Sequence, residues 1–235
     1  MSKPTKSVIN KNKFPHHIGH RKRIKEKYKK SGLDGWLDHE VLEFALSYAI
    51  SRKDTKPIAK ELLSRFQTFS GVLDAEMKDL KEIKSISEHT ALFIRLLKDI
   101  AVCYLERELY NKDLISSPKV VYDYLKSSLK GACDEEFKAL FLNNKNCLLA
   151  LETIQKGTVT KSVVYPRKIV ERALYNHAVG VIVAHNHPGG SLNPSEDDLK
   201  VTKFIRDALK TIDVVLLDHI IIGGNGYFSF KEHNC

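Results

Sequence analysis

Hydrophobic and polar positions along the chain follow two different spacings. From about residue 38 to residue 110, apolar residues return at every third or fourth position, which predicts amphipathic helices. Pro57 suits the first turn of the second of these helices, and a single apolar stripe predicts a long helix over about residues 88–110. This part of the chain is therefore expected to be a small unit of three or four helices.

The spacing changes after residues 111–118, which lose the helical period and end in Ser-Pro, so a domain boundary is expected there. Beyond it, short helices alternate with apolar runs of strand length, and the continuous run over residues 179–184 is typical of a strand buried on both faces. This pattern predicts a mixed α/β domain. The expected strands are 137–143, 147–151, 158–165, 179–184, 214–217, 220–222 and 227–230, and the expected helices lie near 120–125, 166–174 and 196–211.

Positive charge is concentrated at the start of the chain. The formal net charge is +9, yet residues 1–32 carry eleven lysines and arginines against one glutamate, or +10, which leaves −1 for the rest. This arm is expected to be disordered, and it either binds nucleic-acid phosphates, with Arg21, Lys22, Arg23 and Lys25 as candidate contacts, or is a solvated tail. The expected domains are a basic arm over 1–32, a helical domain over 33–112 and an α/β domain over 113–235.

Composition and cysteine placement narrow the class of protein. The hydrophobic share of 43% and the charged share of 29% are ordinary for a globular protein, which excludes collagen-like and wholly disordered chains. No apolar run approaches the roughly 20 residues needed to span a bilayer, and no secretory signal is visible, so a cytoplasmic protein without a membrane partner is expected. The four cysteines form no C-x-x-C pair and are expected to be free thiols in a reducing compartment.

One short segment carries the strongest chemical signal. His185 and His187 are two residues apart at the end of the predicted buried strand, so both side chains face the same way. Asp198 follows in the first turn of the next predicted helix and can fold back as a third metal ligand. Two histidines and one carboxylate leave one tetrahedral position open for water, as a catalytic zinc site requires. Iron, manganese or cobalt could occupy the same ligand set.

A structural interpretation of the same residues remains open. Ser195-x-x-Asp198 has the form of a capping box, in which Asp198 only satisfies a backbone N–H at the start of a helix. Ser195 can serve both interpretations, because its backbone can cap the helix while its hydroxyl faces the cleft. Asp218 and His219 form a further polar pair beside apolar strands, and either orient a zinc ligand or are structural.

The pattern His185-x-His187, seven residues, Ser195-x-x-Asp198 resembles the motif of JAMM (MPN+) metalloproteases, and the flanking residues resemble the RadC-like (UPF0758) proteins within that superfamily. The resemblance covers about residues 113–235 strongly and 38–110 more loosely. The flanking segments that carry it are Gly157-Thr-Val, Pro166-Arg167, Ala173-Leu174, Ala184-His-Asn-His-Pro188, Pro194-Ser195 and Leu217-Asp-His219-x-Ile221-Ile-Gly223.

The resemblance implies a JAMM/MPN-type fold, a mixed sheet flanked by helices with layering like that of cytidine deaminases. It implies one Zn²⁺ per chain on His185, His187 and Asp198, with Ser195 stabilising the oxyanion. It also implies a glutamate general base, Glu135, with Glu136 as the alternative since neighbours in a strand point oppositely. For residues 38–110 it implies a helix-hairpin-helix-like domain.

Two functions are therefore expected to compete. The first is a zinc-dependent hydrolase that cleaves a peptide or isopeptide bond in a peptide or protein substrate, with zinc-activated water as nucleophile. The second is a DNA-associated repair or recombination accessory protein, in which the zinc site is structural or acts on nucleic acid. The basic arm favours the second function, whereas the ligand set and Glu135 favour the first.

Overall fold

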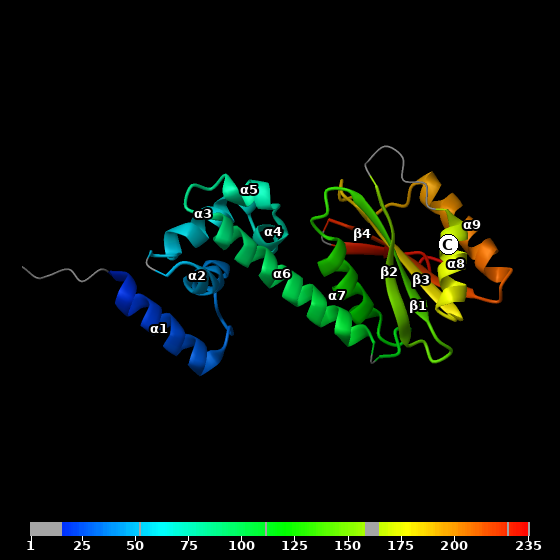
Figure 1. The fold of residues 1–235 in the computed structure, drawn as a ribbon, viewed down its shortest axis with the longest axis horizontal. Helices are drawn as coiled ribbons and strands as arrows, with labels where there is room; N and C mark the ends of the chain where they lie inside the picture. The colour runs from blue at the N-terminus through cyan, green and yellow to red at the C-terminus, as the bar shows by residue number, and fades with distance from the viewer. Residues whose placement is uncertain (1–15, 52, 111, 158–164, 225, 235) are drawn as a thin grey trace, which may run out of the picture. The chain divides into compact units, whose positions relative to one another are not determined.

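The computed structural model describes residues 16–51, 53–110, 112–157, 165–224 and 226–234, as a helical region followed by a mixed α/β domain (Figure 1). Packing divides the chain into residues 1–94 and 95–235, inside helix α6 (Glu88–Leu109) rather than after residue 112. The C-terminal half of α6 belongs to the second unit, since Val102, Leu105 and Leu109 join its core. The first unit also holds α1 (His16–Ser31), α2 (Asp38–Ala49), α3 (Lys56–Phe66), α4 (Phe69–Asp74) and α5 (Met77–Lys81).

The expectation of a disordered arm is wrong for residues 16–31, which form α1, while residues 1–15 lie outside the described part. The Arg21 guanidinium donates hydrogen bonds to four backbone carbonyls at and beyond the C-terminal end of α2, those of Ser47, Ile50, Ser51 and Lys53. A cation is favourable there because the end of a helix exposes unpaired carbonyls and carries partial negative charge. These long-range contacts order the basic segment despite its low hydropathy.

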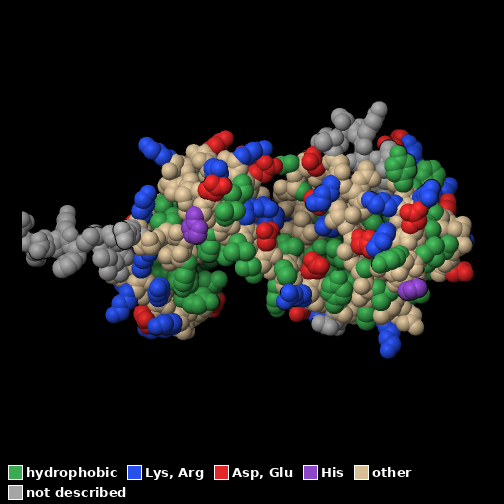
Figure 2. Space-filling view, viewed as in Figure 1, with side chains coloured by type: hydrophobic (Ala, Val, Ile, Leu, Met, Phe, Trp, Pro, Cys, Tyr) green, Lys and Arg blue, Asp and Glu red, His purple; other side chains and the backbone are tan. Residues whose placement is uncertain are grey.

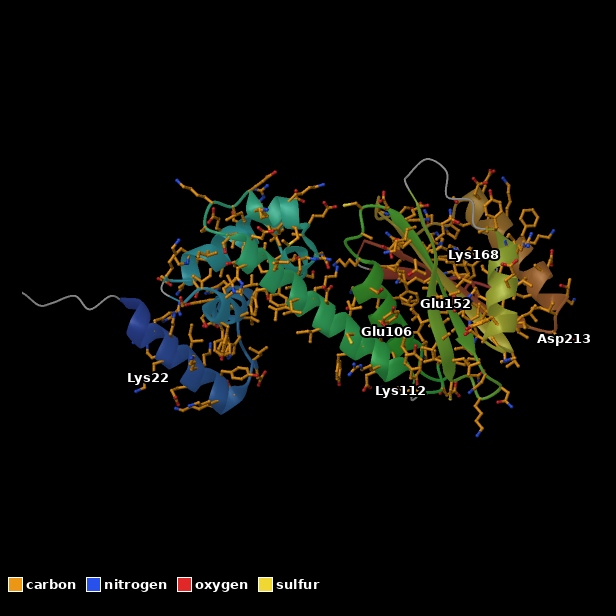
Figure 3. The ribbon with its side chains drawn as sticks, in the orientation of Figure 1. Lys22, Glu106, Lys112, Glu152, Lys168 and Asp213 are labelled. Atoms are coloured by element: carbon orange, nitrogen blue, oxygen red, sulfur yellow. The ribbon has the colours of Figure 1, made fainter. Side chains whose placement is uncertain are left out.

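The other expected nucleic-acid contacts remain on the surface of α1. Lys22, Arg23 and Lys25 are exposed, and basic side chains gather over this helix in Figure 2. Figure 3 labels Lys22, whose side chain extends away from α1. Arg21 differs from them, since its guanidinium is hydrogen-bonded to the carbonyls near α2.

The first unit has its own hydrophobic core, formed by Leu42 and Leu46 of α2, Leu62 of α3 and the apolar start of α6. Residues Lys84–Glu88 connect α5 to α6, at the position of the turn in a helix-hairpin-helix unit but with serines where that turn has glycines, and they cap α6. Ser87 Oγ accepts a hydrogen bond from the Thr90 N–H at 3.3 Å in the first turn of α6, and Ile86 is buried in the core. Ser87 thus stabilises the start of α6, whereas the Ser85 hydroxyl donates to the Glu61 carboxylate of α3 at 3.1 Å.

The second unit is built on a five-stranded sheet of order β2-β1-β3-β4-β5, in which only the β3–β4 pair is parallel. Helix α7 covers one face, and α8 and α9 cover the other (Figure 1). β3 lies in the middle and is buried almost throughout, as its apolar run predicts. The elements are α7 (Pro118–Leu129), β1 (Glu135–Leu142), β2 (Leu148–Gly157), α8 (Pro166–Tyr175), β3 (Gly180–His187), α9 (Glu196–Lys210), β4 (Val215–Gly223) and β5 (Gly226–Ser229).

Polar contacts hold α8 against the sheet. Arg172 of α8 forms a two-point salt bridge with Glu152 of β2, with both N–O distances at 2.6 Å, and Lys168 donates to the Ile154 carbonyl. Figure 3 labels Glu152 on β2 and Lys168 on α8. The planar guanidinium matches the carboxylate at two points, which fixes the helix on the sheet face that also carries the candidate site.

The strands differ from the predicted ranges, and β3 continues to His187. β1 begins at Glu135, so the two candidate glutamates lie inside the strand, and β2 continues to Gly157. The two runs expected over 214–217 and 220–222 form one strand, β4, which contains Asp218 and His219. The strand expected over 158–165 lies outside the described residues, apart from Tyr165, which precedes α8.

Two further expectations concern membrane-spanning segments and the cysteines. Within the described part of the chain, no helix combines the length and apolar character needed to cross a membrane. Cys103 and Cys147 are free thiols, as expected, and Cys235 is outside the described residues.

Candidate metal centre

β3 supplies two of the three candidate ligands. Its side chains alternate, so Val181 and Val183 enter the core beneath α8 and α9, while Ile182 and Ala184 enter the core beneath α7. His185 and His187 continue the first series and therefore lie on the α8–α9 face. The His185 ring stacks on Phe137 of the neighbouring strand, with ring centroids 5.8 Å apart and an interplanar angle of 8°.

Helix α9 supplies the third candidate ligand through its N-terminal cap. Ser195 Oγ accepts from the Asp198 N–H at 3.1 Å, and one Asp198 oxygen, Oδ2, accepts from the Ser195 N–H and hydroxyl at 2.7 Å each. The capping box is thus formed, and the Ser195 hydroxyl takes part in it, whereas the sequence suggested that only its backbone would. The cap fixes the Asp198 carboxylate on the side facing β3.

The three candidate ligands converge on one point. The two histidine Nε2 atoms lie 3.0 Å apart, and the Asp198 carboxylate lies 3.1 Å from His185 Nε2 and 3.4 Å from His187 Nε2. One donor atom from each residue lies within 4.8 Å of the others. The His185 side chain is 6% exposed, against 15% for His187 and 14% for Asp198, so the group is reached from solvent on the side of the latter two.

Both imidazoles direct their Nε2 atoms to the centre because their Nδ1 atoms are already bonded. His187 Nδ1 lies 3.0 Å from the Ser191 carbonyl, which can only accept, so Nδ1 carries a proton. His185 Nδ1 lies 2.9 Å from Nε2 of His219, which is fully buried. Two neutral rings held this way point two Nε2 lone pairs at each other, an arrangement that a cation between them stabilises.

A close backbone approach brings the Ser191 carbonyl to His187. A Cβ atom at Gly223, the last residue of β4, would lie 2.5 Å from the Ser191 carbonyl oxygen. Only glycine leaves room for the loop after β3 to pack on the end of β4. Gly223 thus contributes indirectly to the orientation of the His187 ring.

The charges of the group are strongly coupled. Burial alone would raise the pKa of Asp198, but when His185 and His187 are protonated their hydrogen bonds to the carboxylate outweigh it and hold that pKa well below its usual range. The hydrogen bond with Asp198 raises the pKa of His187, against the effect of burial, and the charge of Glu135 adds a smaller contribution in the same direction. Burial among apolar groups, with the nearby charge of His185, lowers the pKa of His219 well below its normal value.

The two candidate glutamates face opposite sides of the sheet. Glu135 alternates with Phe137 and Ala139, which lie in the α8–α9 core, and its charge acts on His187. Glu136 carries its side chain to the other face, where its carboxylate lies 2.9 Å from Lys156 Nζ and 3.9 Å from Lys138 Nζ. The structure therefore brings Glu135, and not Glu136, to the side of the sheet that holds the histidines.

Asn186 is a residue whose role the sequence analysis missed. The backbone pairing of β1 with β3 ends at Phe137, which lies opposite His185. Beyond this point the Asn186 side chain makes the hydrogen bonds to the backbone at the start of β1. Its Oδ1 accepts from the Glu136 N–H at 2.8 Å, and its Nδ2 donates to the Asp134 carbonyl at 3.1 Å. Asn186 thus holds the backbone on both sides of Glu135. An asparagine between two candidate ligands was the available signal, but its partners lie 50 and 52 residues away.

A register shift in β4 brings His219 to the site. Val181 pairs with Leu216 but Ile182 pairs with Asp218, so β4 has one extra residue at this point. Without it, Asp218 would stand opposite Val183; with it, His219 does and faces α9. Asp218 faces away and accepts a hydrogen bond from Ser229 Oγ of β5 at 2.7 Å. Of the two polar residues, His219 therefore faces the site, and Asp218 contacts Ser229 at the end of β5.

Comparison with known proteins places this fold and site in a family. A family model described as the RadC-like JAB domain matches residues 115–235, which contain the whole sheet and all three candidate ligands. UPF0758 protein FN0909 of Fusobacterium nucleatum subsp. nucleatum is 38% identical over 221 residues, which cover 91% of this chain and 95% of that protein. Since both comparisons agree with the motif and its geometry, the chain belongs to the RadC-like JAB domain (UPF0758) family.

Proposed function

We propose that this protein is a zinc-dependent hydrolase of peptide or isopeptide bonds, with one zinc ion per chain on His185, His187 and Asp198. The observation that carries the proposal is the pair of Nε2 atoms 3.0 Å apart, next to a carboxylate, with both Nδ1 atoms hydrogen-bonded elsewhere. Two imidazoles and one carboxylate are a ligand set of catalytic zinc sites and leave a coordination position open. The donor chemistry therefore fits zinc.

A zinc ion in this place would supply a water molecule with its pKa lowered to about 7 and a positive charge beside the substrate carbonyl. The protein's own groups do the rest. Glu135, on the same side of the sheet as the histidines, takes the proton of the attacking water and returns it to the leaving nitrogen. The one hydroxyl proton of Ser195 goes to Asp198 in the structure, so it must turn to the substrate to stabilise the oxyanion.

The test is the metal content of the purified protein and of a His185→Ala/His187→Ala double variant, by elemental analysis without added metal. We expect about one zinc per chain in the wild type and none in the double variant, since the ligand set loses two of its three members. The matched control is His89→Ala, an exposed histidine on α6, which should keep its zinc. A wild-type protein without bound metal, or a double variant that retains it, overturns the metal site.

The metal-bearing protein is then screened against peptides and isopeptide-linked pairs, with a chelator-treated sample in parallel. Cleavage that requires the metal supports the hydrolase. A metal-bearing protein that cleaves neither class argues for a structural metal and so for the second candidate function below.

The second candidate is association with nucleic acid, with zinc structural or acting on the nucleic acid itself. It is favoured by α1, an ordered helix that exposes Lys22, Arg23 and Lys25 while Arg21 binds carbonyls. We expect Lys22→Glu/Arg23→Glu to weaken DNA binding and to lower the slope of log affinity against log salt by about 2, one for each lost phosphate contact. Lys60→Glu, at an exposed position of α3, is the control. An unchanged slope removes α1 from DNA binding.

A further inference from the structure

A chain of buried hydrogen bonds runs behind the candidate metal centre. His185 Nδ1 lies 2.9 Å from His219 Nε2, and His219 Nδ1 lies 2.6 Å from Thr202 Oγ1. Thr202 Oγ1 in turn donates to the backbone carbonyl of Asp198 at 2.5 Å. The chain therefore begins at one candidate ligand, on β3, and ends at the backbone of another, on α9.

The direction of every hydrogen bond in this chain follows from its last member. The Asp198 carbonyl can only accept, so it takes the single proton of the Thr202 hydroxyl. Thr202 must then accept from His219, which places the His219 proton on Nδ1. His219 Nε2 is left as an acceptor, and the proton between the two rings belongs to His185 Nδ1. The remaining nitrogen of His185, Nε2, faces the centre with its lone pair.

The surroundings of the chain keep it neutral and fixed. His219 has no solvent exposure and Thr202 is 2% exposed. The His219 ring stacks on Phe230 with centroids 4.7 Å apart, and Phe137 lies 5.6 Å away. An unpaired charge among these rings is costly, whereas a neutral ring with both nitrogens bonded satisfies all its polar atoms.

We propose that His219 and Thr202 are positioning residues for the metal centre: they hold His185 as the Nδ1–H tautomer and tie its ring to the helix that carries Asp198. The proposal rests on the zinc site proposed above. It adds an explanation of how His185 of β3 and Asp198 of α9 keep a fixed spacing. Partners behind metal-binding histidines commonly fix the tautomer and the ring orientation in this way. Here the partner histidine is reached only because of the extra residue in β4.

The experiment compares Thr202→Val, which removes the hydroxyl at nearly constant volume, with Thr202→Ser, which keeps it. The first readout is the tautomer of His219 and His185 in metal-free protein labelled with ¹⁵N-histidine, from long-range ¹H–¹⁵N spectra. We expect Nδ1–H rings at both positions in the wild type and in Thr202→Ser. In Thr202→Val the His219 Nδ1–H loses its acceptor, so we expect its tautomer population to change. A merely packed threonine would leave the spectra unchanged.

The second readout is the dissociation constant for Zn²⁺, from competition with a chelating dye. We expect Thr202→Val to bind zinc about 10–100-fold more weakly, the usual cost of losing a partner behind a ligand, and Thr202→Ser to stay near the wild-type value. If the valine variant does not fold, as judged by circular dichroism, Thr202→Ala removes the same hydroxyl with a smaller side chain.

The outcomes separate this proposal from the one it rests on. A wild-type protein that binds no zinc overturns the proposed function, and the metal-free spectra still decide whether the chain of hydrogen bonds from His185 to Asp198 exists. Unchanged tautomers in the hydroxyl-free variant overturn this chain, whether or not zinc binds. Changed tautomers with unchanged zinc affinity overturn its positioning role.

Discussion

Glu135→Gln is expected to abolish hydrolysis by this protein while its zinc content stays at the wild-type level. Glutamine has nearly the same size but cannot take a proton from water, and the loss of a general base slows a reaction about 10²–10⁴-fold. Zinc is retained because the three candidate ligands are other residues. The two measurements are turnover of a substrate found in the peptide and isopeptide screen, and elemental zinc in the same preparation.

Glu136→Gln is the matched control, with the same chemical change one residue further along β1. Its carboxylate pairs with Lys156 on the opposite face of the sheet, so we expect nearly unchanged turnover. The reverse result, with Glu136→Gln inactive and Glu135→Gln active, would reassign the general base. Equal activity of both variants would remove a glutamate of β1 from the mechanism.

The choice between these two glutamates shows where sequence reasoning ended. Alternation along a strand says that only one of them faces the site, but it does not say which one until the pairing of β1 with β3 is known. The structure pairs Phe137 with His185, and this register carries Glu135 to the histidine face. The Asn186 amide then holds the residues on both sides of it, through bonds that span 50 residues or more.

The elements that the sequence predicts well are those whose signal is local. The continuous apolar run before His185 became the buried central strand β3, and the spacing in 88–110 became α6. Ser195 and Asp198 likewise formed the capping box within four residues of chain. In each case, neighbouring residues determine the structure, so a single sequence contains the information.

The features that were missed depend on distant contacts. The basic segment over residues 16–31 looks like a solvated tail, but it is a helix that Arg21 holds against α2 through hydrogen bonds to carbonyls 26 to 32 residues away. The role of His219 depends on one extra residue in β4, which no periodicity reveals because the run is apolar on both sides of it. Register and docking are set by tertiary packing, which a local pattern does not contain.

Asp198→Asn is expected to weaken zinc binding by more than the roughly 10–100-fold that the loss of a partner behind a ligand costs, since it removes the only negative ligand. The capping box should survive, because the asparagine Oδ1 can still accept from the Ser195 N–H and hydroxyl. We therefore expect the free energy of unfolding of the metal-free protein to change by no more than about 1 kcal/mol. Dye competition for Zn²⁺ and urea unfolding measure the two quantities.

Ser195→Ala is the complementary variant, because it removes part of the helix cap and keeps the candidate ligands. It removes the hydroxyl that caps α9, which costs about 0.5–2 kcal/mol of stability, yet it leaves all three ligands in place. We expect the alanine variant to be less stable but to bind zinc within a few-fold of the wild type. If Asp198→Asn binds zinc normally and loses stability instead, Asp198 is only a capping residue. Together the two variants separate the two roles of the Asp198 carboxylate, which are to cap α9 and to bind the metal. One oxygen accepts the hydrogen bond of the helix cap, and the other faces His185.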